Sequence, residues 1–203
     1  IKSYIRYTHN GKKKVTEMWR VHHTKMDAGE PFKGGIRFHP GVTAELLQVL
    51  SMDMTKKCVL AGLPFGGAKG GVPIDPAQFT RAELRVIAER VAEELYENGC
   101  LDPDNDVPGP DMGVDSDIIF WIFNQVDVVN RRGRKLSNIK AAITGKSEKD
   151  GGVPGRDEAT ARGGLIALEE YIHLSKLFSE KPKLAIQGFG NVGSNMARLA
   201  YTA

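Results

Sequence analysis

Two glycine-rich segments, each built around one lysine, constrain this chain more than any other feature. The first is Phe32-Lys33-Gly34-Gly35-Ile36-Arg37, and the second runs from Pro64 to Val72 with Lys69 between two glycine pairs. Glycine costs backbone entropy and is used where main chain must come close to another group. A lysine with such neighbours is a cation that no adjacent side chain shields from a small molecule. We interpret both segments as loops that hold a carboxylate or tune an amine, and flexible loops with solvated lysines are the alternative.

The composition excludes several classes of partner. The chain has 203 residues, of which 41% are hydrophobic and 26% charged, which is ordinary for a globular protein. A net charge of +3 is too small to indicate nucleic acid, and the apolar stretches are too short for a membrane span. We therefore predict neither partner. Cys58, Cys100 and five scattered histidines show no metal-type spacing, so no metal is predicted, and the cysteine usage fits a cytoplasmic protein.

The first part of the chain carries clear signals for a hairpin and a helix. Strands are predicted at 3–8 and 15–22, and Asn10-Gly11 between them is a strong turn signal. Thr43 is the predicted N-cap of a helix that ends near Lys57. The residues of this helix that we expect to be buried are Leu46, Leu47, Val49, Leu50 and Met54.

Two further helices are predicted before residue 135. Thr80-Arg81-Ala82-Glu83 is a capping box, and Gly99 closes the helix that it begins. Another helix is predicted from Ser116 to Asn130. The stretch 104–113 between them contains two prolines and two glycines, and we expect no regular structure there. The buried face predicted for the Thr80 helix consists of Leu84, Ile87, Val91 and Leu95.

The composition changes after residue 135, and glycines at 151–155 indicate a linker. A long helix is predicted at 158–178, followed by a buried strand at 184–187 and a helix that begins near Val192. Because the chain begins with Ile1 and stops at Ala203 inside a predicted helix, we expect it to be part of a longer protein. The apolar face predicted for the long helix consists of Leu165, Leu168, Tyr171 and Ile172.

The turn Gly188-x-Gly190-x-x-Gly193 lies between the predicted strand and the last helix. This context is typical of a dinucleotide-binding turn, in which backbone amides and the helix dipole face a pyrophosphate. A tight turn without a ligand is the alternative. The acidic residue that would contact the ribose, about 20 residues further on, would lie beyond Ala203.

Asp111 is the candidate acid. It lies in Asp106-Val107-Pro108-Gly109-Pro110-Asp111, where the prolines fix the backbone, and a rigid acid suits proton transfer. Capping of the helix at Ser116 is the alternative role. Lys57 ends a predicted helix, where a cation is favoured by the dipole alone.

Six motifs occur in an order and at distances that resemble one family. They are Lys33 to Arg37, Pro64 to Gly71, Asp106 to Asp111, Thr144 to Lys146, Gly155 to Thr160 and Gln187 to Gly193. From about Val15 onward the chain resembles the glutamate dehydrogenases of the glutamate/leucine/phenylalanine/valine dehydrogenase family.

The resemblance implies an α/β fold in two domains. Residues 1–150 would form a mixed-sheet domain that binds the substrate and builds the oligomer, a hexamer in the family. Residues 151–203 would be the first βα unit of a Rossmann-type nucleotide domain. The implied reaction is NAD- or NADP-dependent oxidative deamination of L-glutamate to 2-oxoglutarate and ammonia.

The resemblance also implies roles for individual residues. Lys69 would be the catalytic lysine that activates water, its pKa lowered by Lys33, Lys57 and desolvation. Asp111 would pass a proton to and from the amine. The remaining substrate-binding residues would be Lys33, Met54, Lys57 and Arg156, and the cofactor-binding residues Thr160, Gly188, Gly190, Asn191, Val192 and Gly193.

Lys33 carries the substrate prediction, because relatives that act on apolar amino acids have an apolar residue there and an unpaired buried ammonium is costly. A lysine therefore favours glutamate. Three alternatives stay open: an amino-acid dehydrogenase for another L-amino acid, a Rossmann-type enzyme for a different acid, and a non-catalytic assembly subunit. All the enzymatic expectations require that Lys69, Asp111, Lys33 and Lys57 converge on one pocket.

Overall fold

The computed structural model describes residues 1–133, 136, 138–176 and 182–202. It divides the chain into two compact units, Ile1–Gly152 and Val153–Ala203, which are described separately. The predicted α/β fold class is confirmed, because the first unit combines helices with a mixed sheet.

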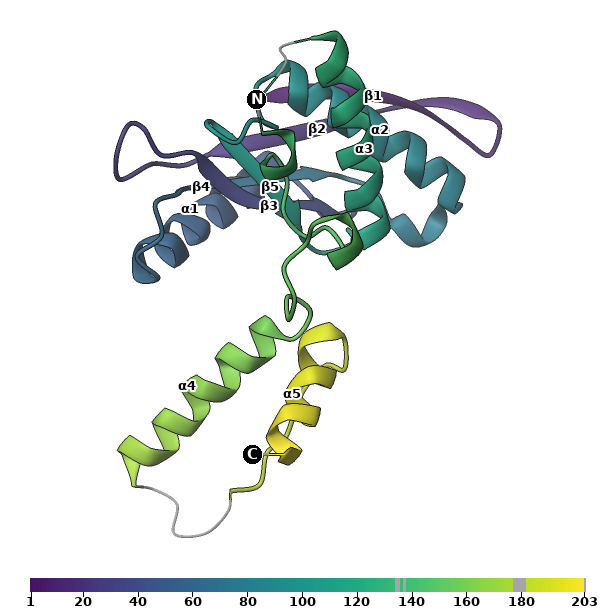
Figure 1. Ribbon diagram of the computed structural model, residues 1–203. Helices are drawn as coiled ribbons and strands as arrows, with labels where there is room; N and C mark the ends of the chain where they lie inside the picture. The colour runs from purple at the N-terminus through teal and green to yellow at the C-terminus, as the bar shows by residue number, and fades with distance from the viewer. Residues whose placement is uncertain (134–135, 137, 177–181, 203) are drawn as a thin grey trace. The chain divides into compact units, whose positions relative to one another are not determined.

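Within the described residues the strands form one five-stranded sheet in the order β1-β2-β4-β3-β5 (Figure 1). The strand β2 pairs antiparallel with β1 and β4, whereas β3 pairs parallel with β4 and β5. The strand β3 therefore lies between the two strands that carry Lys69 and lead to Asp111. The strands are β1 (Lys2–His9), β2 (Lys12–His22), β3 (Phe32–Phe38), β4 (Gly66–Val72) and β5 (Asp106–Pro110).

The predicted hairpin is confirmed. The strands β1 and β2 pair from Lys2 opposite Trp19 to His9 opposite Lys12. Asn10 and Gly11 form the turn with φ angles of 50° and 72°. Two consecutive positive φ angles are what a two-residue hairpin turn requires, and asparagine and glycine tolerate them.

The prediction of loops around Lys33, Lys69 and 104–113 was wrong, because these segments contain β3, β4 and β5. Glycine disfavours strands on propensity alone, but packing against neighbouring elements overrides that preference. Every residue of β4 is buried. The strand β5 lies at the edge of the sheet, where its prolines remove no ladder bond that the sheet interior needs.

The helix α1 (Ala44–Leu60) begins where predicted, and the Oγ1 of Thr43 accepts a hydrogen bond from the backbone N–H of Leu46. Of the side chains predicted to be buried, only Leu47 is buried. Val49 is 53% exposed, and Leu46, Leu50 and Met54 are half-buried. The helix instead turns a face with small polar side chains to the glycine strand β4, and that face consists of Leu47, Ser51, Thr55 and Cys58.

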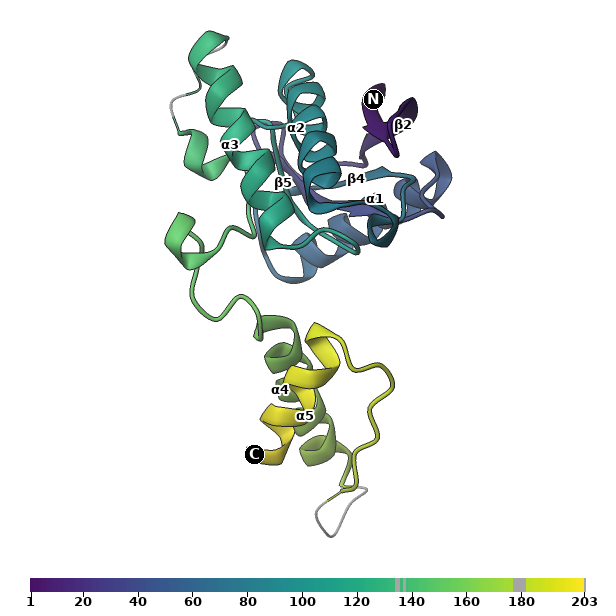
Figure 2. The ribbon, with the colours of Figure 1, turned by 90° about the vertical axis from the view of Figure 1, so that its right-hand side faces the viewer.

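The helices α2 (Arg81–Glu97) and α3 (Ser116–Arg132) lie beside each other, as Figure 2 shows. The predicted capping box of α2 is present, with both Thr80 and Glu83 bonded to backbone N–H groups. Asp115, rather than Asp111, caps α3 by accepting from the N–H of Ile118. The main core lies between these helices and the sheet, and it includes Ile36, Phe38, Val72, Leu84, Ile87, Val91, Leu95, Ile118, Ile119, Ile122 and Val126.

Short 3-10 turns complete the first unit. They are Pro76–Gln78, Ile139–Ala141 and Glu148–Asp150. No helix in the described part of the chain is both long enough and apolar enough to span a bilayer.

The second unit contains the helices α4 (Ala159–Ser175) and α5 (Asn191–Thr202), which pack against each other. The predicted end of the first of them, Phe178, lies outside the described residues. Of the residues on the predicted apolar face, Leu165, Leu168 and Ile172 are half-buried and Tyr171 is 56% exposed.

The buried strand predicted at 184–187 is not formed. A strand needs a neighbour for its backbone N–H and C=O groups. The described residues of the second unit include no other strand that could pair with it. Leu184 is correspondingly 47% exposed, and the segment leads into the turn at Gly188 as irregular chain.

Candidate active site

The first unit brings Lys69 and Asp111 into direct contact. Lys69 lies in the middle of β4 and is 6% exposed, and Asp111 follows the last residue of β5. The Nζ of Lys69 donates a hydrogen bond to the Oδ1 of Asp111 over 2.7 Å. The two residues that the sequence marked as candidate catalytic groups therefore form a largely buried pair.

Glycine at position 35 makes this contact possible. Gly35 lies on β3 opposite Gly109 of β5. A Cβ atom at this position would lie 2.7 Å from the Cβ of Asp111 and 2.8 Å from the carbonyl oxygen of Pro110. The absent side chain leaves the space into which Asp111 packs, so here glycine serves a close approach rather than a loop.

Arg37 is a second cation bound to Asp111, and it was not predicted as a site residue. Its Nε donates to the Oδ2 of Asp111 over 2.5 Å. The strand alternation of β3 puts Arg37 on the same face as Lys33 and Gly35. This alternation could have identified Arg37 from the sequence. It was not applied, because side chains alternate between two faces only in a strand, and the segment was interpreted as a loop.

Charge partners outweigh burial at Asp111. Burial alone would raise the pKa of this carboxyl, but the hydrogen bonds from Lys69 and Arg37 and their positive charges lower the pKa below its usual value. Asp111 is therefore held as a carboxylate with a cation on each oxygen.

At Lys69, burial outweighs the effect of the charge partner Asp111 on the pKa. Burial lowers the pKa of this amine, the bond and charge of Asp111 oppose that change, and the positive charges of Arg37 and Lys57 lower it further. The net effect is a pKa below the ordinary lysine value, the direction that was predicted. Arg37 joins Lys57 as a cation that contributes to this effect.

The other predicted substrate residues of the first unit lie on β3 and α1. Lys33 lies on β3, and its Nζ is 3.2 Å from where a Cβ of Gly109 would be. Lys57 lies in the last turn of α1 with an exposed side chain. Met54, half-buried, precedes Lys57 by one helical turn. Of these residues, Lys57 is close enough for its charge to lower the pKa of Lys69, and together with Lys69 and Arg37 it supplies cations suited to an anionic ligand.

A second buried ion pair lies beside this region, and the sequence analysis missed it. Arg20 of β2 is 1% exposed and Asp106 is fully buried. The guanidinium of Arg20 binds both oxygens of Asp106 and also donates to the carbonyl of Gly34 over 3.0 Å. His22 contacts the Oδ2 of Asp106 at 2.7 Å. The pair joins β2 to β3 and β5, the strands from which Arg37 and Asp111 come.

The same region gathers three possible metal ligands, although their spacing in the sequence gave no sign of it. Ligand atoms of His22, Cys100 and Asp106 lie within 4.8 Å of one another. Arg20 already neutralises Asp106 through both carboxylate oxygens, which disfavours a cation there. Burial, with the charge of Asp106, raises the pKa of the Cys100 thiol to about 12, so this sulfur is protonated at neutral pH.

The glycine turn of the second unit needs glycine at two of its positions. Gly188 has a φ of 88°, and a Cβ at Gly193 would lie 2.0 Å from the carbonyl oxygen of Gly188. The helix α5 begins at Asn191 with no acidic residue in its first turn. Its N-terminal amides and dipole are therefore compatible with a pyrophosphate.

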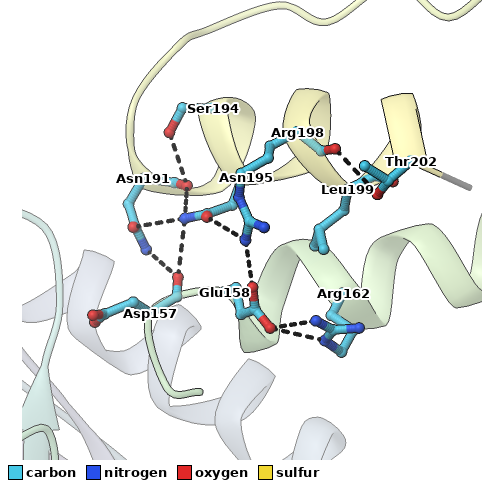
Figure 3. Close-up of polar contacts among 9 residues, drawn as sticks. All are labelled: Asp157, Glu158, Arg162, Asn191, Ser194, Asn195, Arg198, Leu199 and Thr202. Atoms are coloured by element: carbon cyan, nitrogen blue, oxygen red, sulfur yellow. Dashed lines mark hydrogen bonds and ion pairs between the residues drawn. The ribbon is translucent and has the colours of Figure 1, made fainter. Parts of the chain in front are cut away.

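Polar contacts tie this turn to the start of α4 (Figure 3). The side-chain amide of Asn191 donates to the carbonyl oxygen of Asp157 over 2.9 Å. Glu158 forms ion pairs with Arg162 of its own helix and with Arg198 of α5. The predicted residues Arg156 and Thr160 lie next to these groups in the chain and are exposed.

Comparison with known proteins assigns both units to one family. Residues 2–128 match the model for the Glu/Leu/Phe/Val dehydrogenase dimerisation domain, and residues 151–203 match the model for Glutamate/Leucine/Phenylalanine/Valine dehydrogenase. Glutamate dehydrogenase B of Halobacterium salinarum is 38% identical over 91% of the chain. A catabolic NAD-specific glutamate dehydrogenase of Bacillus subtilis is 37% identical over 96%. The chain covers 41% and 44% of these two proteins, less than half of their length.

Solved structures of similar proteins agree with this assignment. The hetero-hexameric glutamate dehydrogenase of Thermus thermophilus, in a leucine-bound form, matches the whole chain with a TM-score of 0.90 and 33% identity. The glutamate dehydrogenase of Peptoniphilus asaccharolyticus matches it with a TM-score of 0.83 and 34% identity. The chain covers 47% and 49% of these structures. On the sequence, the fold and these matches together, the chain belongs to the Glu/Leu/Phe/Val dehydrogenase family.

Proposed function

We propose that the protein is an oxidoreductase that deaminates L-glutamate to 2-oxoglutarate and ammonia with a nicotinamide cofactor. The observation that carries this proposal is the buried Lys69–Asp111 contact, surrounded by further cations, in a chain of this family. Deamination needs a base that activates water, a group that moves the proton of the amine, and cations that hold the carboxylates of the substrate. The candidate site offers a residue of suitable chemistry for each.

Lys69 is the proposed base. A lysine is useful in that role when a fraction of it is neutral near physiological pH. Its lowered pKa, caused first by burial, moves it in that direction. The neutral amine takes a proton from the water that attacks the iminium carbon of the oxidised substrate.

Asp111 is the proposed proton carrier for the substrate amine. Its lowered pKa keeps it ionised, as an acceptor must be. It accepts a proton from the substrate ammonium before oxidation and returns one to the leaving ammonia. The contact with Lys69 allows protons to pass between the two groups at 2.7 Å.

Lys57 and Lys33 are proposed to hold the substrate carboxylates. Lys57 binds the α-carboxylate with Met54 beside it, and Lys33 pairs the side-chain carboxylate. A lysine at position 33 favours glutamate over an apolar amino acid, because its positive charge attracts a side-chain carboxylate that an apolar substrate lacks. Arg156 is proposed as a further substrate contact.

The proposed cofactor is NAD, as in the relatives named NAD-specific, and NADP is the alternative. When bound, nicotinamide supplies the hydride acceptor. The turn formed by Gly188, Gly190 and Gly193 fits a pyrophosphate, with Asn191 and Val192 at the start of α5. Thr160 is proposed to contact the cofactor at the start of α4.

The proposed assembly is a homo-oligomer, and specifically a hexamer. Its support is the match to a dimerisation-domain model and to a Thermus thermophilus structure described as hetero-hexameric. Light scattering of the purified full-length gene product would give the mass that decides this point.

The test is an assay of the full-length gene product with L-glutamate and either NAD or NADP. Reduction of the cofactor is expected with glutamate, and Lys69→Ala is expected to lower kcat by about 10²- to 10⁴-fold, because general base catalysis has that size. Arg85→Ala, which changes an exposed cation on α2, serves as control. Near-normal turnover of Lys69→Ala would remove Lys69 from the mechanism.

The same assay separates the alternatives. A wild-type protein that prefers L-leucine to L-glutamate would contradict the role proposed for Lys33. Absence of turnover with any amino acid, from a folded protein, would favour a non-catalytic assembly subunit.

A further inference from the structure

The carboxylate of Asp111 has a different partner on each oxygen. Lys69 donates to Oδ1 at 2.7 Å, and Arg37 donates to Oδ2 at 2.5 Å. If this carboxylate receives a proton from the substrate amine, the proton must reach a lone pair on one oxygen, beside the hydrogen bond that this oxygen already accepts. The two oxygens are therefore not equivalent in any proton transfer, and their partners decide which oxygen is available.

Lys69 and Arg37 differ in how easily each can break its hydrogen bond to Asp111. A lysine ammonium is a point charge with rotatable donors on a flexible stem, and it can exchange one acceptor for another. Arginine has a planar guanidinium with donors in fixed directions and stays charged. Lys69 can thus leave Oδ1 when it becomes neutral, whereas the Arg37 bond to Oδ2 persists.

The position of Arg37 in the fold supports this difference. Its side chain is 17% exposed, and it lies on β3 between the strand of Lys69 and the strand that leads to Asp111. Gly35, two residues earlier on the same face of the strand, lets Asp111 approach closely. Arg37 and Gly35 together fix where the carboxylate lies and how it is turned.

We propose that Arg37 is a positioning residue that holds Oδ2 of Asp111, so that Oδ1 alone is shared between Lys69 and the amine of the substrate. This inference rests on the proposed function, and it adds a residue to which no role has been assigned above. Proton balance is simple: Oδ1 accepts one proton from the substrate ammonium and passes it on, while the Arg37 bond is unchanged. No other bond forms or breaks in the carboxylate.

The charge of Arg37 acts on both partners in the same sense. It lowers the pKa of Asp111, and as a like charge it lowers the pKa of Lys69. Loss of this charge would raise both pKa values. Both changes move the acidic limb of the pH profile of kcat/KM upward, because that limb reports the groups that must be deprotonated in the free enzyme.

The experiment compares Arg37→Met, Arg37→Gln and Arg37→Lys in the full-length gene product. Met and Gln remove the charge at similar length, whereas Lys keeps it. We expect the acidic limb of kcat/KM to shift upward by about one pH unit in the two neutral variants, the size typical of losing one nearby charge. Arg37→Lys is expected to stay near the wild-type limb, with a lower kcat because the fixed direction of the donor is lost.

Arg81→Met is the matched control. Arg81 also bridges aspartates, Asp115 and Asp117, but about half of its side chain is exposed. Its removal should leave the pH profile in place. If Arg37 served only for packing, the apolar Met variant would keep the wild-type profile and the Lys variant would be no better, and that result would overturn the proposal.

A second readout does not depend on activity. Acetic anhydride acetylates only neutral amines, so the rate of Lys69 acetylation against pH, followed by mass spectrometry, gives the midpoint of its titration. We expect that midpoint to rise in Arg37→Met and Arg37→Gln but not in Arg37→Lys. A wild type inactive on glutamate would refute the proposed function, and the acetylation midpoints would still decide the role of Arg37. Unchanged midpoints in both neutral variants would refute it.

Discussion

At the scale of single residues, the buried charges in the described part of the chain, Arg20, Lys69 and Asp106, each lie in an ion pair. Asp106 illustrates this. Burial by itself would raise the pKa of its carboxyl, but the charge and hydrogen bonds of Arg20, with those of His22, lower the pKa below its usual value. The pair joins β2 to β3 and β5, so we expect it to support the strands of the candidate site.

We expect Asp106→Asn to lower the free energy of unfolding by about 3–5 kcal/mol, because it leaves the buried guanidinium of Arg20 without its counterion. Urea unfolding followed by tryptophan fluorescence measures this, since both tryptophans lie in Ile1–Gly152. The control is Asp53→Asn, which removes an exposed pair with Lys56 and should cost at most about 1 kcal/mol. Equal costs for the two variants would contradict this account.

The carboxylates of Asp106 and Asp111 make the free energy of unfolding depend on pH, and the directions of their pKa shifts fix the sign of this dependence. Because the pKa of Asp106 and that of Asp111 are lowered on folding, their contribution is fully present above the unfolded value of about 3.9 and is lost as the pH falls through the folded values. The wild type should therefore lose stability below about pH 4, and Asp106→Asn should lose less over the same range. Urea midpoints measured at several pH values would show an equal loss if the carboxylate of Asp106 were not involved.

The site residues that could be predicted from the sequence are those that are unusual among their neighbours in the chain. The residues that could not be predicted owe their role to where the fold places them. Lys69 and Asp111 were identifiable because a lysine among glycines and an acid directly after two closely spaced prolines stand out locally. Arg37 and Arg20 did not stand out, because arginine is common at surfaces. Their roles depend on strand pairing between residues that are far apart in the chain, which local patterns do not reveal.

At the scale of secondary-structure elements, the contact between α1 and β4 depends on missing side chains. Gly67 lies on β4, and a Cβ there would be 2.2 Å from both the carbonyl oxygen of Ser51 and the Oγ1 of Thr55. The Oγ1 of Thr55 also accepts from the N–H of Gly67 at 3.1 Å. The helix that carries Lys57 is thus held against the strand that carries Lys69 at a distance only glycine allows.

We expect Gly67→Ala to lower the free energy of unfolding by about 1–3 kcal/mol through overpacking, and to displace α1. Because Lys57 lies at the end of α1, the variant should also raise KM for glutamate in the full-length gene product. Gly29→Ala is the control, since a Cβ there meets nothing within 4 Å. A Gly67→Ala protein with unchanged stability and KM would contradict this prediction, because it would show that α1 and β4 can accommodate a Cβ atom at position 67 without a cost.

The helices of the first unit could be predicted and its inner strands could not, for one physical reason. Helix signals are local: the caps at Thr43 and Thr80 and the spacing of apolar residues lie within a few turns. The strands β3 and β4 are set by what packs against them, and their glycines read as loop signals. The strand predicted at 184–187 failed for the converse reason, since its local pattern was right but it has no pairing partner among the described residues.

At the scale of the whole molecule, the two units differ in how much apolar surface they bury. The main core lies entirely within residues 5–143. Among the described residues of Val153–Ala203, the buried apolar side chains are Ala161 and Leu199. Large apolar side chains of that unit stay exposed, among them Leu174 at 68% and Tyr201 at 93%.

Local stability should follow this difference, because buried apolar contacts are what oppose local opening. In hydrogen exchange of the 203-residue chain, we expect amides in the middle of α2 to be the best protected and those of α4 and α5 to exchange much faster. Glu158 pairs with Arg162 of α4 and with Arg198 of α5, and both pairs lie near the surface, where ion pairs add little stability. Glu158→Gln should therefore change the exchange of α4 only slightly. Protection in α4 and α5 equal to that in α2 would contradict this account, because it would mean that the second unit is stabilised by something other than its own buried apolar side chains.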